Sequence, residues 1–235
     1  MFFPRLVLAE EVRRLIMLSI SLSGIKNGFI LGLLFAGVST FAEFEGKKSK
    51  WKGYTKTEFK VGEHAAFVVE PKTQAVGKPW VWRARFPTYH TEIDELLLAD
   101  GYHIAHINTG SKLGSPKALA IWKEFYDLLT TQYGLNQKMA LEGVSRGGLY
   151  VYRWAKNYPQ TVACIYNDTP VCDFKSWPGG KGKGKGAKGE WKRVLKEYGF
   201  TNEAEALAYA DNPIDKLQAI VDARIPIMHI VTEDD

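Results

Sequence analysis

The segment Met139–Tyr150 constrains the fold and the chemistry of this 235-residue chain more than any other. It reads as a short apolar strand, then Gly143-Val144-Ser145-Arg146-Gly147, then a helical run through Trp154. A strand, the pattern Gly-x-Ser-x-Gly and a helix form the layout of a nucleophile elbow, a turn so sharp that its flanking positions must be small. The backbone N–H of Arg146 would then lie at a helix N-terminus, which favours an oxyanion. The alternative is a glycine-rich turn with an incidental serine.

Composition is that of an ordinary globular protein with room for one sizeable core. Hydrophobic residues make up 46% of the chain and charged residues 24%. Much of the formal net charge of +5 comes from the Lys/Gly run 181–189, so it is weak support for a nucleic-acid partner, and we expect none. No zinc-type Cys/His spacing, Walker loop or Gly-x-Gly-x-x-Gly occurs, and we expect neither a metal nor an organic cofactor.

Residues 1–42 are predicted to lie outside the fold, as a signal peptide with a possible mis-assigned N-terminal extension if Met17 is the true start. The apolar run 30–38 has signal-peptide length and is too short to span a bilayer comfortably. Small residues ending at Ala42 suit cleavage, and 43–54 would be a linker. An uncleaved membrane anchor is the alternative. We therefore expect a secreted or periplasmic protein without a stable membrane span after cleavage.

From residue 55 onward, strand and helix patterns alternate, which predicts an α/β fold with a mostly parallel sheet flanked by helices. A segment over 173–212 interrupts the alternation. The expected strands cover 57–61, 65–69, 80–86, 103–107, 139–141, 162–166 and 225–231, and the expected helices cover 91–100, 115–133, 147–154, 191–198, 203–210 and 213–223.

The elbow and this order of elements resemble the α/β-hydrolase superfamily over roughly residues 55–235. The resemblance implies that the last strand and helix of that fold are missing, and that 173–212 is a cap-like insertion. It also implies that the loop after 80–86 gives a second oxyanion donor, the backbone N–H of Arg85 or Phe86. The segment 169–180 resembles a subgroup of exported bacterial hydrolases of unassigned substrate.

In this superfamily the nucleophile, the acid and the histidine follow in chain order. By position Asp235 is the expected acid, with Asp234, Glu233 and Asp168 as alternatives; the acidic C-terminal residues could also be a solvated end. All five histidines of the sequence precede the expected acid: His64, His90, His103, His106 and His229. The resemblance therefore implies a truncated chain whose general base lies beyond residue 235, with impaired activity as written.

Three arginines suggest the character of the pocket. Arg83 and Arg85 are two apart on an expected strand and would share a face, and Arg146 follows the serine. Their guanidinium groups would favour an anionic substrate or an acidic sugar. The alternative is that Arg83 and Arg85 pair with buried carboxylates such as Glu142 or Asp168.

Other side chains carry weaker expectations. His90 and Trp177 are candidate substrate contacts, whereas His103, His106 and His229 lie inside expected strands and are more typical of packing. Aromatic residues of the strand 80–86 are more typical of a core than of a sugar platform. The Lys/Gly run would be a surface loop. Cys164 and Cys172 could form a disulfide or remain two free thiols.

These observations predict a serine hydrolase that cleaves a carboxylic ester, on a small molecule or a carbohydrate, through an acyl-enzyme on Ser145. A prolyl-oligopeptidase-like peptidase is an alternative, but the chain lacks the repeats of an N-terminal propeller. A non-catalytic carbohydrate- or surface-binding relict of the fold is another. The sequence does not indicate the oligomeric state.

Overall fold

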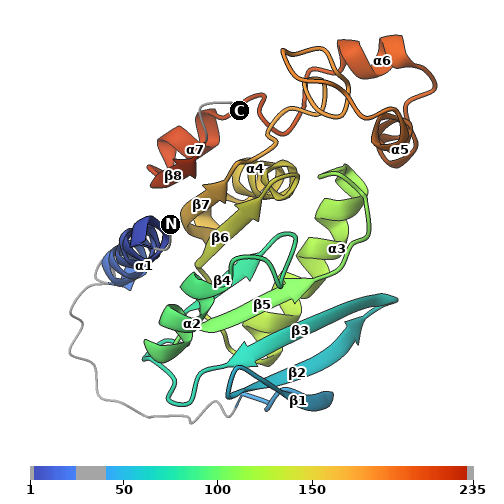
Figure 1. Ribbon diagram of the computed structural model, residues 1–235. Helices are drawn as coiled ribbons and strands as arrows, with labels where there is room; N and C mark the ends of the chain where they lie inside the picture. The colour runs from blue at the N-terminus through green and yellow to red at the C-terminus, as the bar shows by residue number, and fades with distance from the viewer. Residues whose placement is uncertain (1–2, 25–40, 232–235) are drawn as a thin grey trace.

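The computed structural model describes the backbone of residues 3–24 and 41–231, in which one twisted sheet lies between two layers of helices (Figure 1). The sheet order is β1-β2-β3-β5-β4-β6-β7-β8. The first three strands pair antiparallel, β3 also pairs antiparallel with β5, and the remaining neighbours are parallel. The strands are β1 Lys47–Trp51, β2 Tyr54–Val61, β3 His64–Glu70, β4 Trp80–Arg83, β5 His103–Ile107, β6 Met139–Val144, β7 Val162–Asp168 and β8 Ile227–Ile230.

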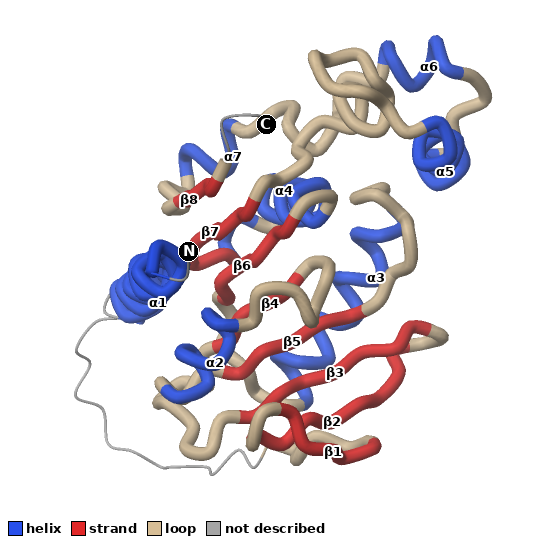
Figure 2. Tube along the Cα trace, in the orientation of Figure 1, coloured by secondary structure: helices blue, strands red, loops and turns tan. Residues whose placement is uncertain are grey.

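The helices divide between the two faces of the sheet and an outlying insertion. Helices α1 (Phe3–Gly24) and α2 (Glu92–Ala99) cover one face. Helices α3 (Pro116–Asp127), α4 (Gly147–Asn157) and α7 (Gln218–Asp222) cover the other, and a π-helical turn, Leu128–Gln132, extends α3. Helices α5 (Lys188–Tyr198) and α6 (Glu203–Ala208) belong to the insertion, which is mostly loop (Figure 2).

An aromatic stack fills the core on the α3/α4 face. The Trp82 ring lies 4.1 Å from Trp122, 5.1 Å from Trp154 and 5.5 Å from Trp80, measured between ring centroids. All four side chains are fully buried. Aromatic pairs at such distances add to the stability gained from burial alone. The aromatic strand β4 is therefore a core element and offers no sugar-stacking surface through Trp80 or Trp82.

Helix α1 is part of the packed structure, which corrects the prediction that residues 1–42 lie outside the fold. Its buried side chains recur every three or four residues, as expected for a helix with one face on a sheet. They pack in one cluster with residues of β4, β6 and β7. The Arg13 guanidinium also pairs with the Asp100 carboxylate at the end of α2. The buried α1 residues are Ala9, Val12, Ile16 and Ile20.

The predicted linker is also wrong, because residues 43–54 contain strand β1 and the start of β2. The apolar run 30–38 lies outside the described residues, so export and cleavage after Ala42 stay predictions. Within the part of the chain that the structure describes, no helix is long and apolar enough to cross a membrane. Cys164 and Cys172 are both free thiols, the alternative to the disulfide.

The insertion folds around a small aromatic cluster beside α4. Phe174 is fully buried and contacts the rings of Tyr198, Phe200 and Tyr209 at 4.8, 6.2 and 6.0 Å. Arg153 of α4 anchors the end of the insertion by pairing with the Asp211 carboxylate at 2.7 Å. The Lys/Gly run is exposed, as predicted for a surface loop, although its last two residues begin α5.

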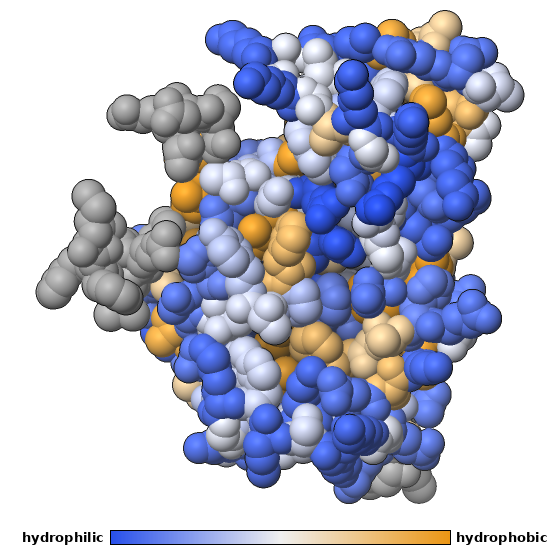
Figure 3. Space-filling model, turned by 45° about the vertical axis from the view of Figure 1, so that its right-hand side comes forward, coloured by the Kyte–Doolittle hydropathy of each residue, from blue (hydrophilic) through white to orange (hydrophobic). Residues whose placement is uncertain are grey.

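The surface over the insertion is mainly hydrophilic. In the space-filling view the upper part of the molecule, where α5 and α6 lie, is mostly blue, and apolar residues form small separate patches (Figure 3). The described residues therefore offer no broad apolar surface in this view.

The packing of α1 can be tested with a pair of substitutions on one helix. Ile16→Ala removes a side chain that is 1% exposed, whereas Leu18→Ala changes one that is 63% exposed. We expect Ile16→Ala to lower the free energy of unfolding by about 2–5 kcal/mol and Leu18→Ala by less than about 0.5 kcal/mol, measured by urea denaturation. Equal, small effects of both substitutions would show that α1 does not pack on the sheet.

Candidate active site

Ser145 lies at the carboxyl end of the central strand β6, in a turn that leads directly into α4. Its backbone has a positive φ of +50°, a conformation that residues other than glycine rarely adopt. Three hydrogen bonds hold it there. The Ser145 N–H donates to the Asp168 carbonyl at 3.0 Å, and the Ser145 carbonyl accepts from the N–H groups of Gly148 at 3.1 Å and Val171 at 2.9 Å. Strain of this kind, fixed by surrounding structure, is typical of functional sites.

Two glycines make this turn possible, and only one of them, Gly143, is among the two expected. A Cβ atom at Gly143 would lie 2.1 Å from Asn167 Oδ1, and one at Gly148 would lie 2.6 Å from the Val171 carbonyl oxygen. At Gly147 the nearest atoms would be the Cβ atoms of neighbouring residues at 3.5 Å, an ordinary contact. The close approaches therefore require Gly143 and Gly148, whereas the predicted need for a small residue at 147 is not supported.

The loop after β4 lies against the start of α4. Phe86 has a positive φ of +51°, and its ring lies beneath two guanidinium groups, those of Arg85 at 5.6 Å and Arg146 at 5.5 Å. Arg85 also donates to the Gly110 carbonyl at 2.8 Å, and Arg146 pairs with the Glu190 carboxylate of α5 at 3.3 Å. Burial lowers the pKa of Arg85, and the nearby charge of Arg146 acts in the same direction. Two positive groups thus gather beside Ser145.

Arg83 is not among them. Strand β4 ends at Arg83, so Arg83 and Arg85 do not share a sheet face, and the Arg83 side chain is fully buried. It pairs with the carboxylates of Asp94 and Glu142, the latter at 3.2 Å. This corrects the expectation that Arg83 binds substrate and favours the alternative, pairing with a buried carboxylate.

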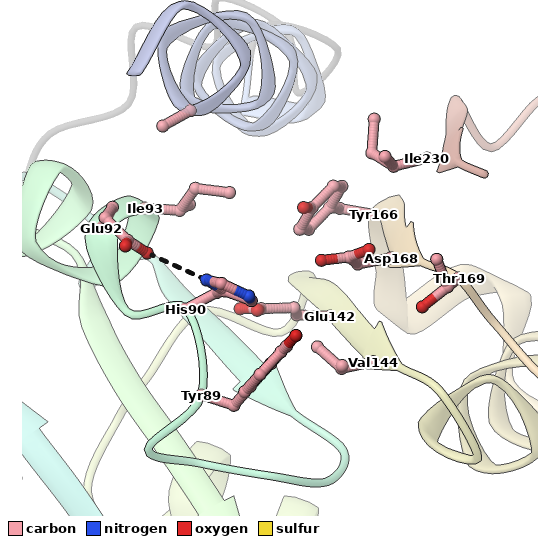
Figure 4. Close-up of a pocket in the computed structure, with 11 residues that line it drawn as sticks. Tyr89, His90, Glu92, Ile93, Glu142, Val144, Tyr166, Asp168, Thr169 and Ile230 are labelled. Atoms are coloured by element: carbon pink, nitrogen blue, oxygen red, sulfur yellow. Dashed lines mark ion pairs between the residues drawn. The ribbon is translucent and has the colours of Figure 1, made fainter. Parts of the chain in front are cut away.

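A pocket of about 270 Å³ lies beside the serine turn, toward α1 (Figure 4). We call it the acidic pocket, because the carboxylates of Glu92, Glu142 and Asp168 line it together with His90 and two tyrosines, Tyr89 and Tyr166. Its apolar wall contains Ala9 of α1, Ile93, Val144 and Ile230. Val144 directly precedes Ser145, so the pocket adjoins the turn.

His90 and Asp168, two of the candidate site residues, therefore line the same pocket. His90 has a φ of +49°, and its Nδ1 atom lies 3.9 Å from the Glu92 carboxylate. Trp177 is not among the described residues that line the pocket and instead packs, partly buried, against the core. Asp234 and Asp235, and Glu233 with them, lie outside the described residues.

The other histidines are held by unrelated contacts. His103 and His106 are buried and lie within hydrogen-bond distance of the Pro79 carbonyl at 3.4 Å and the Arg83 carbonyl at 2.8 Å. Burial lowers the pKa of both to about 4, so both are neutral at pH 7. His229 lies 2.8 Å from the Tyr152 hydroxyl, and His64 lies 3.2 Å from the Asn108 carbonyl oxygen.

Glu142 is the site residue that the sequence reasoning missed except as an ion-pair partner. Its side chain is 3% exposed. Burial raises the pKa of Glu142 to about 8. The positive charge of Arg83 acts in the opposite direction, and the negative charge of Asp94 adds to the rise, because one guanidinium cannot neutralise both carboxylates. The sequence signal for this residue was an acidic side chain inside an otherwise apolar strand, on the same strand face as Val144.

Among the described residues no cluster of His, Cys, Asp or Glu side chains could hold a metal ion.

The glycine assignment can be tested by two matched substitutions. We expect Gly143→Ala to destabilise the protein by about 1–3 kcal/mol or to prevent folding, because its Cβ would overlap Asn167. Gly147→Ala should leave the melting temperature within about 2 °C of the wild type. Thermal denaturation followed by circular dichroism measures both, and a greater loss for Gly147→Ala would contradict the geometry.

The buried proton of Glu142 gives a pH dependence with a definite sign. The folded state binds this proton more tightly than the unfolded state, so the free energy of unfolding should fall as pH rises from about 5 to about 8. Glu142→Gln mimics the protonated form and should reduce this fall, by at most about 1.4 kcal/mol per pH unit. Urea denaturation at both pH values measures this, with Glu63→Gln, at an exposed acid, as control. If the free energy of unfolding changed with pH equally in both variants, the raised pKa of Glu142 would be contradicted.

Comparison with known proteins supports the fold. No protein-family model matches the chain, and no curated protein matches its sequence. Among solved structures, S-formylglutathione hydrolase from Staphylococcus aureus is similar with a TM-score of 0.52 and 13% identity, over 75% of this chain and 78% of that one. Puromycin hydrolase is similar with a TM-score of 0.52 and 17% identity, over 71% of this chain and 33% of that one. At these identities the likeness concerns the fold alone. Together with the strand order and the strand–turn–helix at Ser145, it shows that the chain has the α/β-hydrolase fold.

Proposed function

We propose that the protein is a serine hydrolase that cleaves carboxylic esters through an acyl-enzyme on Ser145. The observation that carries this proposal is the backbone of Ser145, held at φ +50° between the end of β6 and the start of α4. This position lies at the carboxyl edge of the sheet, where side chains can reach a ligand. A positive φ at a serine has a cost, and here it is stabilised by hydrogen bonds from two further segments.

In this mechanism the Ser145 hydroxyl attacks the acyl carbon, and the carbonyl oxygen of the ester becomes an oxyanion. The N–H of Arg146, close to the start of α4, is the first proposed donor to that oxyanion. The N–H of Arg85 or Phe86 is the second. A Cβ atom placed at Gly147 would lie 3.5 Å from the Cβ atoms of Ala84 and Arg85, so the two donor segments lie close together, which supports this assignment.

The guanidinium groups of Arg85 and Arg146 would add positive potential at the same place. Glu190 of the insertion compensates part of it through its ion pair with Arg146. The insertion therefore takes part in the electrostatics of the site. This arrangement favours a developing negative charge at the acyl group, and it keeps open the expected preference for small-molecule or carbohydrate esters.

Asp168 is the proposed acid of the catalytic set. Its carbonyl accepts the Ser145 N–H, and its side chain lines the acidic pocket next to that turn. Asp235 and Asp234 stay alternatives. A histidine should take the proton from Ser145 and be oriented by the acid. His64, His103, His106 and His229 are held by other contacts, whereas His90 lines the acidic pocket together with Asp168. Export to the periplasm or the medium is also part of the proposal, and cleavage after Ala42 would remove α1 and with it the Ala9 side of the acidic pocket.

The proposal can be tested with a fluorophosphonate probe and p-nitrophenyl acetate. We expect the wild type to be labelled and to hydrolyse the ester. Ser145→Ala should abolish labelling and lower kcat by about 10³-fold or more, because removal of a nucleophile leaves only the residual catalysis of binding and oxyanion stabilisation.

Ser111→Ala is the matched control, because Ser111 is another half-buried loop serine, 3.1 Å from Arg193 of the insertion. It should retain both labelling and hydrolysis. An unlabelled wild type, or labelling that survives in Ser145→Ala, would refute the proposed nucleophile.

A further inference from the structure

The acidic pocket is a half-open cleft that joins a buried acid, Glu142, whose side chain is 3% exposed, to an exposed one, Glu92, whose side chain is 52% exposed. Four parts of the chain line it: the loop and helix after β4, the ends of β6 and β7, strand β8 through Ile230, and helix α1 through Ala9 (Figure 4). Its volume of about 270 Å³ compares with about 30 Å³ for a water molecule in the liquid. A small organic group fits in this space.

One carboxylate oxygen in the pocket lacks a partner. Glu142 Oε1 lies 3.2 Å from Arg83, but Oε2 is buried and has no hydrogen bond among the described residues. In Figure 4 the carboxylate of Glu142 is directed toward His90, on the pocket side of β6. A buried acceptor without a donor has a free-energy cost that a ligand carrying an N–H or O–H could remove.

The charge of the pocket selects among such ligands. Glu92 and Asp168 contribute carboxylates, and Glu142 adds a third that is ionised only above its raised pKa of about 8. No lysine or arginine is among the described residues that line the pocket. Arg83 stands behind Glu142 and is already engaged with Asp94. A negatively charged ligand would meet like charges here, and a cation would meet opposite ones.

The remaining walls suit a cation on an apolar stem. Tyr89 and Tyr166 contribute aromatic rings, whose faces attract cations, and hydroxyl groups that accept hydrogen bonds. Ile93, Val144 and Ile230 give an apolar wall for a short alkyl chain. We propose that the acidic pocket binds a primary ammonium group carried on a short apolar stem.

This inference deepens the proposed function, and it rests on that function only where it makes the ammonium group part of an ester substrate. Because Val144 lines the pocket and precedes Ser145, an ester held at Ser145 could extend its amine into the pocket. Binding of the ammonium group itself requires no chemistry at Ser145. The two claims can therefore fail separately.

The test is isothermal titration of the protein with n-butylammonium chloride, compared with n-butanol and sodium butyrate at equal ionic strength. We expect butylammonium to bind with a measurable heat, and the neutral and anionic analogues of equal length not to bind. At pH 9, where the Glu142 carboxyl is ionised, Glu142→Gln should weaken the affinity by about tenfold or more, because it removes a charged acceptor. Glu63→Gln, which changes an exposed acid on the β2–β3 turn, is the matched control and should bind as the wild type does.

Asp168→Asn provides a second variant, because Asp168 is not tied to Arg83 and its loss should leave that ion pair intact. It should also weaken butylammonium binding. Ser145→Ala should bind with unchanged affinity, which separates this inference from the nucleophile. Equal binding of butylammonium and butanol, no binding of butylammonium to the wild type, or undiminished binding by both acid variants would overturn the proposal.

Discussion

The close approach of three chain segments around Ser145 is the constraint on which the site depends. Gly143 lies against Asn167 of β7, and Gly148 lies against the backbone that follows β7, so no side chain fits at either position. The same segments accept and donate the hydrogen bonds that hold Ser145 at positive φ. Strand β6, strand β7 and helix α4 are thereby locked in one arrangement. This packing explains how a strained serine can persist at the sheet edge.

The turn at Ser145 lies between two regions of opposite charge. On the side of the insertion, Arg85 and Arg146 flank the Phe86 ring, and Glu190 neutralises part of their charge. On the side of α1, carboxylates line the acidic pocket. Arg83 lies beneath that pocket but is shared between two buried acids, so one of them can stay protonated near neutral pH. An ester that carries an amine could use both surroundings at once.

Local signals were sufficient to predict several elements. Strand β5 covers the predicted residues 103–107, and Ser115 caps α3 through its side chain, as the Ser-Pro pair indicates. The turn at Ser145 was also predictable, because its glycines and its flanking strand and helix are adjacent in the sequence. Features that depend on distant segments were not. Helix α1 is recognisable only when its apolar residues meet the sheet, and the acidic pocket appears only when residues 89–93, 142–144 and 166–169 come together.

The central claim is that Ser145 is the reactive nucleophile, and site mapping by mass spectrometry tests it most directly. After reaction with diisopropyl fluorophosphate, trypsin releases the peptide 139–146, Met-Ala-Leu-Glu-Gly-Val-Ser-Arg, in which Ser145 is the only hydroxyl residue. We expect the phosphoryl adduct on this peptide. An unmodified 139–146 peptide, with the adduct on another residue or absent, would contradict it.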